Sequence, residues 1–282
     1  LAALAHEALG EAERSGVFVA GAALAVPGLV EAATGTVLRA PNLGWRGIPV
    51  ASELSGLLGG LPVRVENEAN LAALAEHARG AARGVRDFIC VFGEVGVGAG
   101  IFLGGELFRG SHGFGGEVGH MTVDPRGEPC ACGSRGCLET VVGQEAIARR
   151  AGIRTAAGGR TRSLTAEIVR RAVAGDERTL AALHDAGAML GTALGSAINL
   201  FDLDAVVLGG CFGPLAPWLV DEVGDALRDH LLSADLSPCE VRTSTFGEDA
   251  ALRGAAALTL REVLAAPRTV SDRRNHVSEA VA

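Results

Sequence analysis

One histidine and three cysteines lie close together near the middle of the chain: His120, Cys130, Cys132 and Cys137. Three thiolates and one neutral imidazole form a tetrahedral ligand set that suits zinc. Glycine and proline residues between them allow the chain to turn sharply enough to present all four groups to one ion. Since no coordination position remains for water, the spacing predicts a structural zinc site in residues 120–137. A loop with free thiols and a separately hydrogen-bonded histidine is the alternative.

The other three cysteines, Cys90, Cys211 and Cys239, are scattered along the chain. This distribution favours one metal site and reduced core thiols over a set of three disulfides. Reduced thiols are typical of the cytosol, so we expect a cytoplasmic protein.

Glycine accounts for 40 of the 282 residues and gathers in short clusters at the expected ends of strands. The run from Gly93 to Gly98 has some likeness to a dinucleotide-binding fingerprint, which requires a helix to follow. Residues 101–103 continue as a strand instead. We therefore reject a dinucleotide site.

The composition indicates a folded, acidic protein. Hydrophobic residues make up 48% and charged residues 21% of the chain, close to the globular average. The formal net charge of -8 is the wrong sign for a surface that attracts nucleic acid. The longest apolar run, 17–30, is interrupted by glycine and proline and is shorter than the roughly 20 residues that span a bilayer. Neither direct DNA binding nor a membrane span is expected.

Hydrophobic periodicity predicts that strands and helices alternate. The expected strands are 17–26, 61–65, 88–92, 98–103, 106–108, 205–208 and 239–242. The expected helices are 68–79, 177–199, 214–232 and 249–264, with helices dominating from residue 144 onward. This alternation predicts a layered α/β fold in which helices cover a sheet.

Several motifs together resemble the ROK family, whose members are bacterial sugar kinases, transcriptional repressors and related open reading frames. The most specific is Gly116-Glu-Val-Gly-His120, followed after nine residues by Cys130-x-Cys132-Gly-x-x-Gly-Cys137-x-Glu139. Further matching segments are 25–28, 40–45, 62–70, 93–100 and 205–210. The resemblance covers almost the whole chain. It implies the two-lobed actin-like ATPase (ribonuclease-H-like) fold, an α/β fold with a sugar site in the cleft between the lobes.

The resemblance also implies a domain organisation. Residues 1–84 would form a partial small N-terminal lobe, and 85–266 the large lobe with the zinc loop at 120–137 and a helical C-terminal half. Residues 267–282 are polar and lack a hydrophobic period, so we expect a disordered tail there. The sequence begins at Leu1 and contains neither the family's first phosphate hairpin, Asp-x-Gly-x-Thr, nor the winged helix-turn-helix of its repressors. We therefore expect an incomplete N-terminal lobe in a chain that is a fragment or a processed form.

The family's sugar-contacting positions fall on carboxylates, amides and one imidazole: Asn42, Asn67, Glu68, Glu117, His120 and Glu139. Such groups suit a hexose, whose hydroxyls both donate and accept hydrogen bonds. His120 belongs to both expected sites, so the zinc loop is expected to hold several sugar contacts rigid. Ordinary solvated loop residues are the alternative.

The phosphate-binding features of the family's kinases are altered in this chain. The kinases carry a catalytic Asp in a Glu-Asn-Asp-Ala-Asn motif, whereas this chain has Glu68, whose extra methylene displaces the carboxylate. Where the kinases carry Gly-Thr-Gly-Ile-Gly, this chain has Glu94 and Val95, which place an anion and a side chain where a phosphate would rest. The remaining glycines are interpreted as remnants of phosphate loops: Gly93, Gly96, Gly98, Gly209 and Gly210.

These departures favour the sugar-binding effector and oligomerisation domain of a ROK-type transcriptional regulator. Its expected partners are a sugar or sugar derivative, a second copy of the chain, and DNA only through a domain missing from this chain. The alternative is an ATP-dependent hexokinase of the glucokinase kind, with magnesium-ATP as cosubstrate and Glu68 as the catalytic base. A sugar-binding domain that has lost both activities is a third interpretation.

Overall fold

A five-stranded mixed sheet forms the centre of the structure, a computed structural model that describes residues 1–154 and 161–267. The strand order is β10-β9-β6-β7-β8. Strands β6, β9 and β10 run parallel, whereas β7 and β8 continue from β6 as an antiparallel meander. The five strands are β6 (Phe88–Gly93), β7 (Val97–Leu103), β8 (Glu106–Phe108), β9 (Ala205–Gly210) and β10 (Glu240–Thr243).

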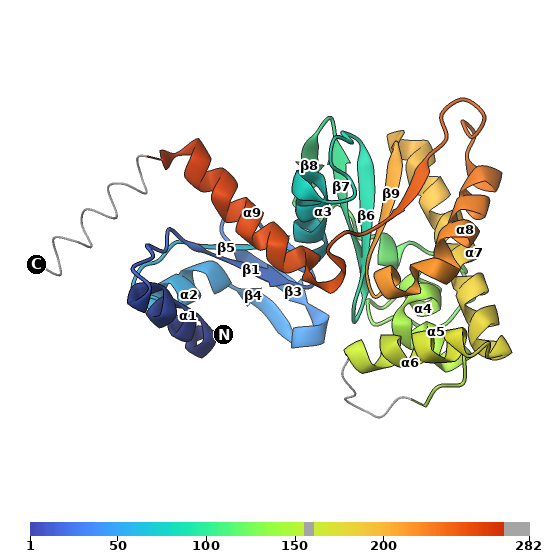
Figure 1. Cartoon of the computed structure of the whole chain (residues 1–282), viewed down its shortest axis with the longest axis horizontal. Helices are drawn as coiled ribbons and strands as arrows, with labels where there is room; N and C mark the ends of the chain where they lie inside the picture. Colours follow the sequence, from blue (N-terminus) through green and yellow to red (C-terminus); the bar gives the residue numbers. More distant parts are fainter. Residues whose placement is uncertain (155–160, 268–282) are drawn as a thin grey trace, which may run out of the picture.

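Both faces of this sheet are buried, because helices cover each of them. Side chains alternate along β6, so Ile89 and Val91 join one core while Phe88, Cys90 and Phe92 join the other. Helices α7 (Glu177–Phe201) and α8 (Phe212–His230) pack over the first core. Helices α3 (Glu68–Arg79) and α9 (Ala250–Ala265) pack over the second (Figure 1).

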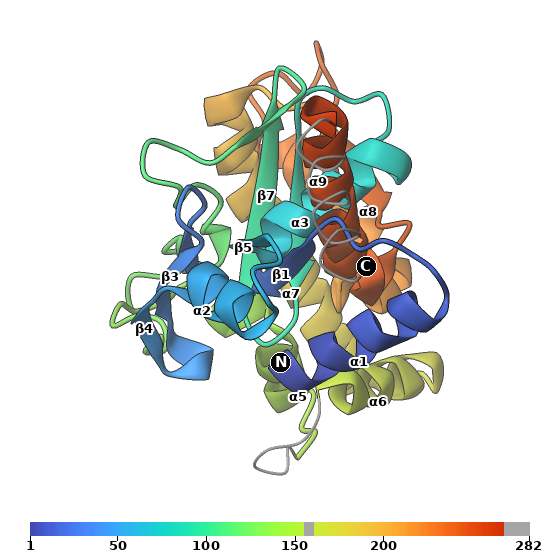
Figure 2. The same ribbon diagram turned by 90° about the vertical axis from the view of Figure 1, so that its left-hand side faces the viewer.

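The N-terminal segment adds two small sheets beside the central one (Figure 2). Strand β1 (Ala22–Val26) pairs in parallel with β5 (Val63–Asn67). Strands β2 (Leu29–Glu31), β3 (Thr36–Ala40) and β4 (Trp45–Ile48) form an antiparallel sheet with a separate core that includes Val30 and Val37. Helices α1 (Ala2–Arg14) and α2 (Val50–Leu57) contribute to the same core.

Helix α9 brings the end of the described chain back to its N-terminal segment. It packs against α3 and β1, and Figure 1 shows it lying alongside β1 and β5. Gly254 faces the backbone of α3, where a Cβ would overlap the carbonyl of Leu71. This close approach lets one helix touch both the small parallel sheet and a helix of the central core.

Three short helices lie between the meander and α7. They are α4 (Glu139–Val142), α5 (Gln144–Arg150) and α6 (Thr161–Val173). Among the described helices, none is both long and apolar enough to cross a membrane. The polar tail expected from residue 267 lies outside the described residues from 268 onward.

Most of the predicted elements are confirmed. The helix over 68–79 and the strands of the meander end within one residue of their predicted bounds. The prediction of a strand over 17–26 is wrong in its first half, because only residues 22–26 have a pairing partner in β5 and Val17 is exposed. Helices α1 and α2 and the antiparallel sheet β2–β4 have no counterpart in the predicted elements.

Candidate functional site

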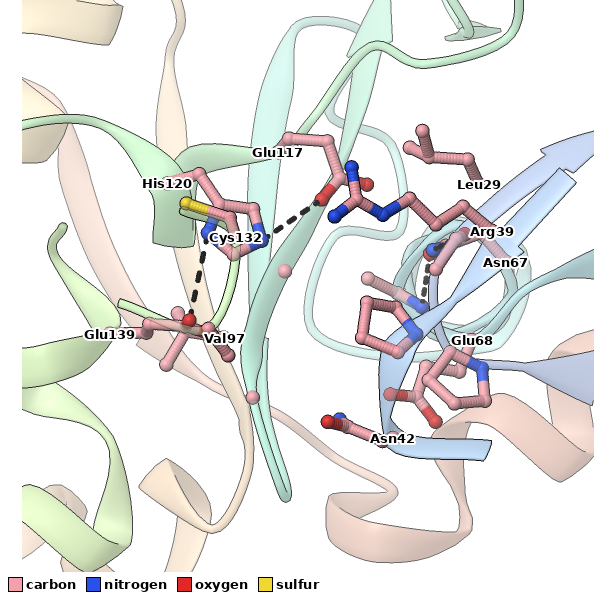
Figure 3. Close-up of a pocket in the computed structure, with 17 residues that line it drawn as sticks. Leu29, Arg39, Asn42, Asn67, Glu68, Val97, Glu117, His120, Cys132 and Glu139 are labelled. Carbon is pink, nitrogen blue, oxygen red and sulfur yellow. Dashed lines mark hydrogen bonds and ion pairs between the residues drawn. The ribbon is translucent and has the colours of Figure 1, made fainter. Parts of the chain in front are cut away.

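A pocket of about 240 Å³ lies between the N-terminal segment and the central sheet. Its N-terminal wall comes from residues 27–42 and 67–69, and its sheet-side wall from residues 96–98 and 117–139 (Figure 3). The volume is below the range of about 300–1,000 Å³ typical of drug-sized ligands, so it suits a small molecule. All six residues predicted to contact a sugar line this pocket: Asn42, Asn67, Glu68, Glu117, His120 and Glu139.

The N-terminal wall is organised by the start of helix α3. Asn67 is the N-cap residue, and its Oδ1 accepts hydrogen bonds from the backbone N–H groups of Ala69 (2.8 Å) and Asn70 (3.3 Å). Its Nδ2 donates to the carbonyl of Gly28 at 2.9 Å. Most of the amide of Asn67 therefore serves the fold, which leaves Arg39, Asn42 and Glu68 as the polar groups of this wall that are open to a ligand.

The carboxyl of Glu68 has an unusual pKa. Burial, and secondarily the negative charge of Glu94, raise the pKa of Glu68 from 4.5 to about 7. A carboxyl with a pKa near neutrality exchanges a proton readily at physiological pH. Glu68 can therefore either accept a hydrogen bond from a ligand hydroxyl or, when protonated, donate one.

The sheet-side wall rests directly on strand β7. A Cβ on Gly116 would overlap the carbonyl of Ala99, and one on Gly119 would overlap the carbonyl of Val97. These two glycines therefore let the segment that carries Glu117 and His120 lie flat against the strand. The local sequence Gly-Glu-Val-Gly-His thus aims a carboxylate and an imidazole into the pocket.

Glu117, His120 and Glu139 form a polar chain along this wall. His120 Nε2 lies 3.9 Å from a carboxylate oxygen of Glu117, and His120 Nδ1 lies 3.6 Å from one of Glu139. Burial raises the pKa of Glu117, and the negative charge of Glu139 adds to this effect, while His120 opposes it. The wall therefore offers both donors and acceptors to a polyhydroxy ligand.

The four predicted metal ligands come together at the edge of the same wall. The ligand atoms of His120, Cys130, Cys132 and Cys137 all lie within 4.8 Å of one another. The Sγ atoms of Cys132 and Cys137 are 3.7 Å apart, and Cys130 Sγ is 3.7 Å from His120 Nδ1. Zinc–sulfur bonds of about 2.3 Å in a tetrahedron would place sulfurs about 3.8 Å apart, so the donor set fits this ion.

The two expected roles of His120 use different ring nitrogens. Nδ1 lies on the side of the thiol cluster, whereas Nε2 lies on the side of Glu117 and the pocket. Figure 3 shows the imidazole between Cys132 and Glu117. One side chain can therefore serve a metal ion and a pocket ligand together.

The five glycines interpreted as phosphate-loop remnants separate into two groups. Gly96 and Gly98 line the pocket. Gly93 and Gly210 are paired between β6 and β9, with Gly209 opposite Phe92, and these three do not contribute to the pocket lining. A Cβ on Gly93 would lie 2.7 Å from the sulfur of Cys211, so close packing of the strand ends also requires this glycine.

Two residues at or beside the pocket were missed by sequence reasoning. Arg39 lines the pocket, and Figure 3 shows its guanidinium extending from β3 toward Glu117. The side chain of Gln144 is buried and donates to the carbonyl of Glu94 at 2.5 Å, while accepting from the hydroxyl of Thr165 at 2.8 Å. In the sequence, the alternation of residue types along 36–40 was the only signal for Arg39. The contact of Gln144 with Glu94 joins segments that are far apart in the sequence, so it leaves no local pattern.

Residues 2–262 match the ROK family, so the chain belongs to that family. A ROK family glucokinase from Streptomyces griseus, solved in complex with glucose and AMPPNP, is 32% identical, with a TM-score of 0.77 over 91% of this chain and 86% of that one. A ROK family transcriptional regulator that is a homologue of the E. coli Mlc protein is 30% identical, with a TM-score of 0.78 over 91% of this chain and 66% of that one.

The xylose repressor of Caldicellulosiruptor bescii is 29% identical over 258 residues, which is 88% of this chain and 64% of the repressor. The chain thus spans less than two thirds of that relative. It has the actin-like sugar kinase fold of the family, an α/β architecture with mixed sheets. The relatives include both repressors and glucokinases.

Proposed function

We propose that this chain is the sugar-binding effector and oligomerisation domain of a ROK-type transcriptional regulator. The observation that carries the proposal is the pocket in which carboxylates and amides from distant segments converge, with Glu68 on one wall and Glu117, His120 and Glu139 on the other. Sugar binding across this pocket would favour one arrangement of the two walls. DNA contacts would come from a domain outside this chain.

The electrostatics beside the pocket support a regulator over a kinase. Glu94 is near enough to Glu68 to raise its pKa. Gln144 holds the backbone of Glu94 in place from the protein interior. A negative charge beside the expected base opposes the approach of a nucleotide phosphate, which carries charge of the same sign.

We further propose that Zn²⁺ occupies the cluster formed by His120, Cys130, Cys132 and Cys137. Four protein ligands leave no coordination position for a reacting group, so the ion would serve the structure only. It would connect the segment that carries Glu117 to the loop that precedes Glu139. Thiolate ligands of this kind persist in a reducing compartment, in line with a cytoplasmic protein.

One observation favours the second candidate, an ATP-dependent hexokinase. The pKa of Glu68, about 7, is the value expected of a general base that works near neutral pH. In this role Glu68 would accept the proton of the sugar hydroxyl that attacks the γ-phosphate of magnesium-ATP.

Calorimetric titration of the zinc-loaded protein separates these candidates. The titrants are hexoses, pentoses and amino sugars, each with and without magnesium-AMPPNP. We expect at least one sugar to bind with an affinity that the nucleotide leaves unchanged. Sugar binding strengthened by nucleotide, together with sugar-dependent ADP release from ATP that Glu68→Gln abolishes, would support the kinase instead.

Oligomerisation is tested by light scattering after size exclusion. One chain has a mass of 28.7 kDa, and we expect a particle of at least twice that mass. A single-chain mass at micromolar concentration, with and without sugar, would remove oligomerisation from the proposal.

A further inference from the structure

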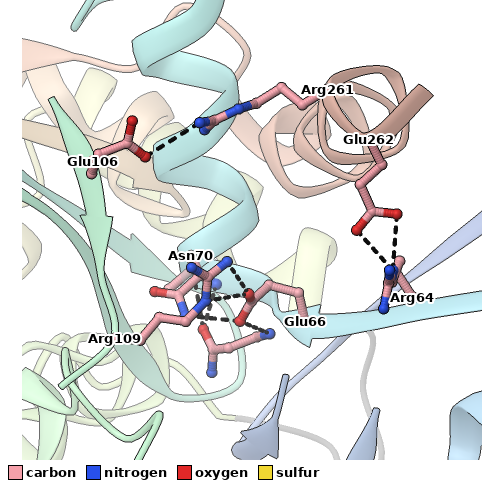
Figure 4. Close-up of polar contacts among 9 residues, drawn as sticks. Arg64, Glu66, Asn70, Glu106, Arg109, Arg261 and Glu262 are labelled. Carbon is pink, nitrogen blue, oxygen red and sulfur yellow. Dashed lines mark hydrogen bonds and ion pairs between the residues drawn. The ribbon is translucent and has the colours of Figure 1, made fainter. Parts of the chain in front are cut away.

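An ion pair between the buried Glu66 and the partly exposed Arg109 lies outside the pocket, beside both of its walls. Glu66 is the next-to-last residue of strand β5 and is only 4% exposed, and its Oε2 accepts a hydrogen bond from Arg109 Nε at 2.9 Å and lies 2.7 Å from Arg109 Nη2 in an ion pair. Figure 4 shows Arg109 reaching across to Glu66 from the segment that follows β8. Neither side chain contributes to the pocket lining.

On the N-terminal side, Glu66 holds the segment that begins α3. Its Oε1 accepts from the backbone N–H of Asn67 at 3.0 Å and from Asn70 Nδ2 at 2.9 Å. The amide oxygen of Asn70, Oδ1, is buried and has no hydrogen-bond partner among the described residues. Burying this oxygen without a partner costs free energy. The hydrogen bond from Asn70 Nδ2 to Glu66 is the side-chain contact that holds the buried amide in place.

On the sheet side, Arg109 begins the loop that leads to Glu117. The carbonyl of Arg109 accepts from the backbone N–H of Gly115 at 2.8 Å, which closes the loop. The next residue, Gly116, accepts from the N–H of Ala99 at 2.9 Å and so docks on β7. Because the loop is closed at Arg109 and docked on β7 at Gly116, the position of Arg109 helps to fix that of the next residue, Glu117.

We propose that Glu66 and Arg109 are positioning residues that fix the spacing between the two walls of the pocket. Glu66 lies two residues before Glu68, and Arg109 opens the loop that ends at Glu117 and is closed by the bond from Gly115 to the carbonyl of Arg109, so the pair links segments that carry a carboxylate of each wall. This inference rests on the proposed function for its binding consequence, although its structural consequence is measurable without a ligand.

The chain offers a matched control on the same strand. Arg64 on β5 forms an ion pair with Glu262 of α9 at 2.7 Å, and both side chains are about half exposed (Figure 4). Exposed pairs of this kind contribute little. Arg64→Gln therefore removes an arginine and an ion pair from β5 without disturbing the buried network.

The first measurement is backbone hydrogen exchange of the ligand-free, zinc-loaded protein. The N–H groups of Ala69 and Asn70 donate to the side chain of Asn67. Their exchange rates therefore report on how firmly Glu66 holds the start of α3. We expect Arg109→Gln to accelerate their exchange about tenfold, within the range of local opening equilibria. Arg109→Lys, which keeps the charge, should have a smaller effect, and Arg64→Gln should have none.

The second measurement is calorimetry with D-glucose, D-xylose and N-acetyl-D-glucosamine. For whichever sugar binds, Arg109→Gln should weaken affinity about tenfold, in the range by which residues outside a site couple to it. Arg64→Gln should stay within about twofold. If Arg109→Gln does not fold, the isosteric Glu66→Gln supplies the same comparison.

The two measurements distinguish two kinds of failure. If exchange at Ala69 and Asn70 and sugar affinity are the same in Arg109→Gln as in Arg64→Gln, the positioning role is wrong. If the unmodified protein binds none of the three sugars and exchange still accelerates only in Arg109→Gln, positioning is supported and the proposed sugar-binding function is the part in doubt.

Discussion

At the residue scale, Glu68 shows two opposing electrostatic effects. It is the first residue of α3, where the helix dipole stabilises a negative charge by roughly 0.3–1 kcal/mol. Burial and the charge of Glu94 act in the other direction and raise its pKa to about 7. A shift of this size corresponds to about 3 kcal/mol, so desolvation outweighs the dipole at this position.

The raised pKa predicts how stability depends on pH. Between pH 4.5 and about 7, Glu68 is protonated in the folded chain but ionised in the unfolded chain. The folded state therefore binds more protons, and this group's contribution to stability is lost as pH rises through that window. We expect Glu68→Gln to gain stability relative to the unmodified protein from pH 4.5 to 8, by up to about 3 kcal/mol.

Urea unfolding of both proteins at several pH values checks this prediction. Loss of zinc at low pH affects both proteins equally, so it cancels in the difference. A stability difference that stays constant across the window would show that Glu68 titrates normally.

At the scale of elements, two glycines allow the sheet-side wall to lie on β7. We expect Gly119→Ala to destabilise the protein by about 1–3 kcal/mol, because its Cβ would overlap the carbonyl of Val97 and force a backbone shift. Sugar affinity should fall with it, since Glu117 and His120 would move. Thermal unfolding and calorimetry measure the two effects.

Gly56 supplies the control for this substitution. It lies within α2, is exposed, and a Cβ there would meet nothing within 4 Å. Gly56→Ala should therefore be neutral or stabilise by up to about 1 kcal/mol through helix propensity. Equal destabilisation by both substitutions would contradict the steric explanation.

The zinc loop and the polar wall should respond differently to mutation. Cys132→Ser removes one of the four proposed zinc ligands, so we expect zinc content to fall well below one per chain and stability to fall by about 2 kcal/mol, which lowers Tm by about 4–8 °C in a chain of this size. Glu139→Gln should keep zinc near one per chain, because Glu139 is not among the four proposed ligands, and should weaken sugar binding, because a neutral amide replaces a carboxylate of the pocket wall.

Metal analysis, thermal unfolding and calorimetry on both variants test this separation of roles. Loss of zinc to the same degree in both would show that Glu139 helps to hold the metal. Retention of zinc in Cys132→Ser would argue against a four-ligand site.

The sequence predicted the central elements better than the N-terminal ones, for a physical reason. Strands β6 and β7 are buried and apolar along nearly their whole length, and α3 combines an Asn67 cap with a Gly80 end, so local signals agree with the final packing. The sheet β2–β4 is short and partly exposed, and it is specified by pairing with other segments rather than by its own periodicity.

The site shows the same division. The resemblance to the ROK family predicted the residues that the structure gathers into one pocket, and the spacing of the cysteines and histidine predicted the thiol cluster. Contacts between distant segments were not predictable, among them the bond from Gln144 to Glu94 and the ion pair of Glu66 with Arg109. No single-sequence pattern encodes which of many arginines meets a given buried carboxylate.

At the scale of the whole molecule, the pocket joins two bodies that have separate cores. Residues 27–42 of the N-terminal wall belong to the small sheets with their own apolar cluster, whereas the start of α3 and the sheet-side wall pack with the central sheet. A ligand that bonds to both walls gains its full set of contacts only when they approach each other. Ligand binding should therefore shift the population toward a closed arrangement.

Small-angle X-ray scattering measures this closure. At saturating sugar we expect the radius of gyration to decrease by about 1 Å, as for hinge closure around a ligand.

Asn42→Ala removes a polar group from the N-terminal wall while the opposite wall stays intact, so this variant should bind more weakly and contract less even when saturated. A full contraction in Asn42→Ala would show that Asn42 takes no part in closure. An unchanged radius in the saturated, unmodified protein would mean that sugar binds within a preformed cleft, and a regulator of this kind would then have to signal through its oligomeric contacts alone.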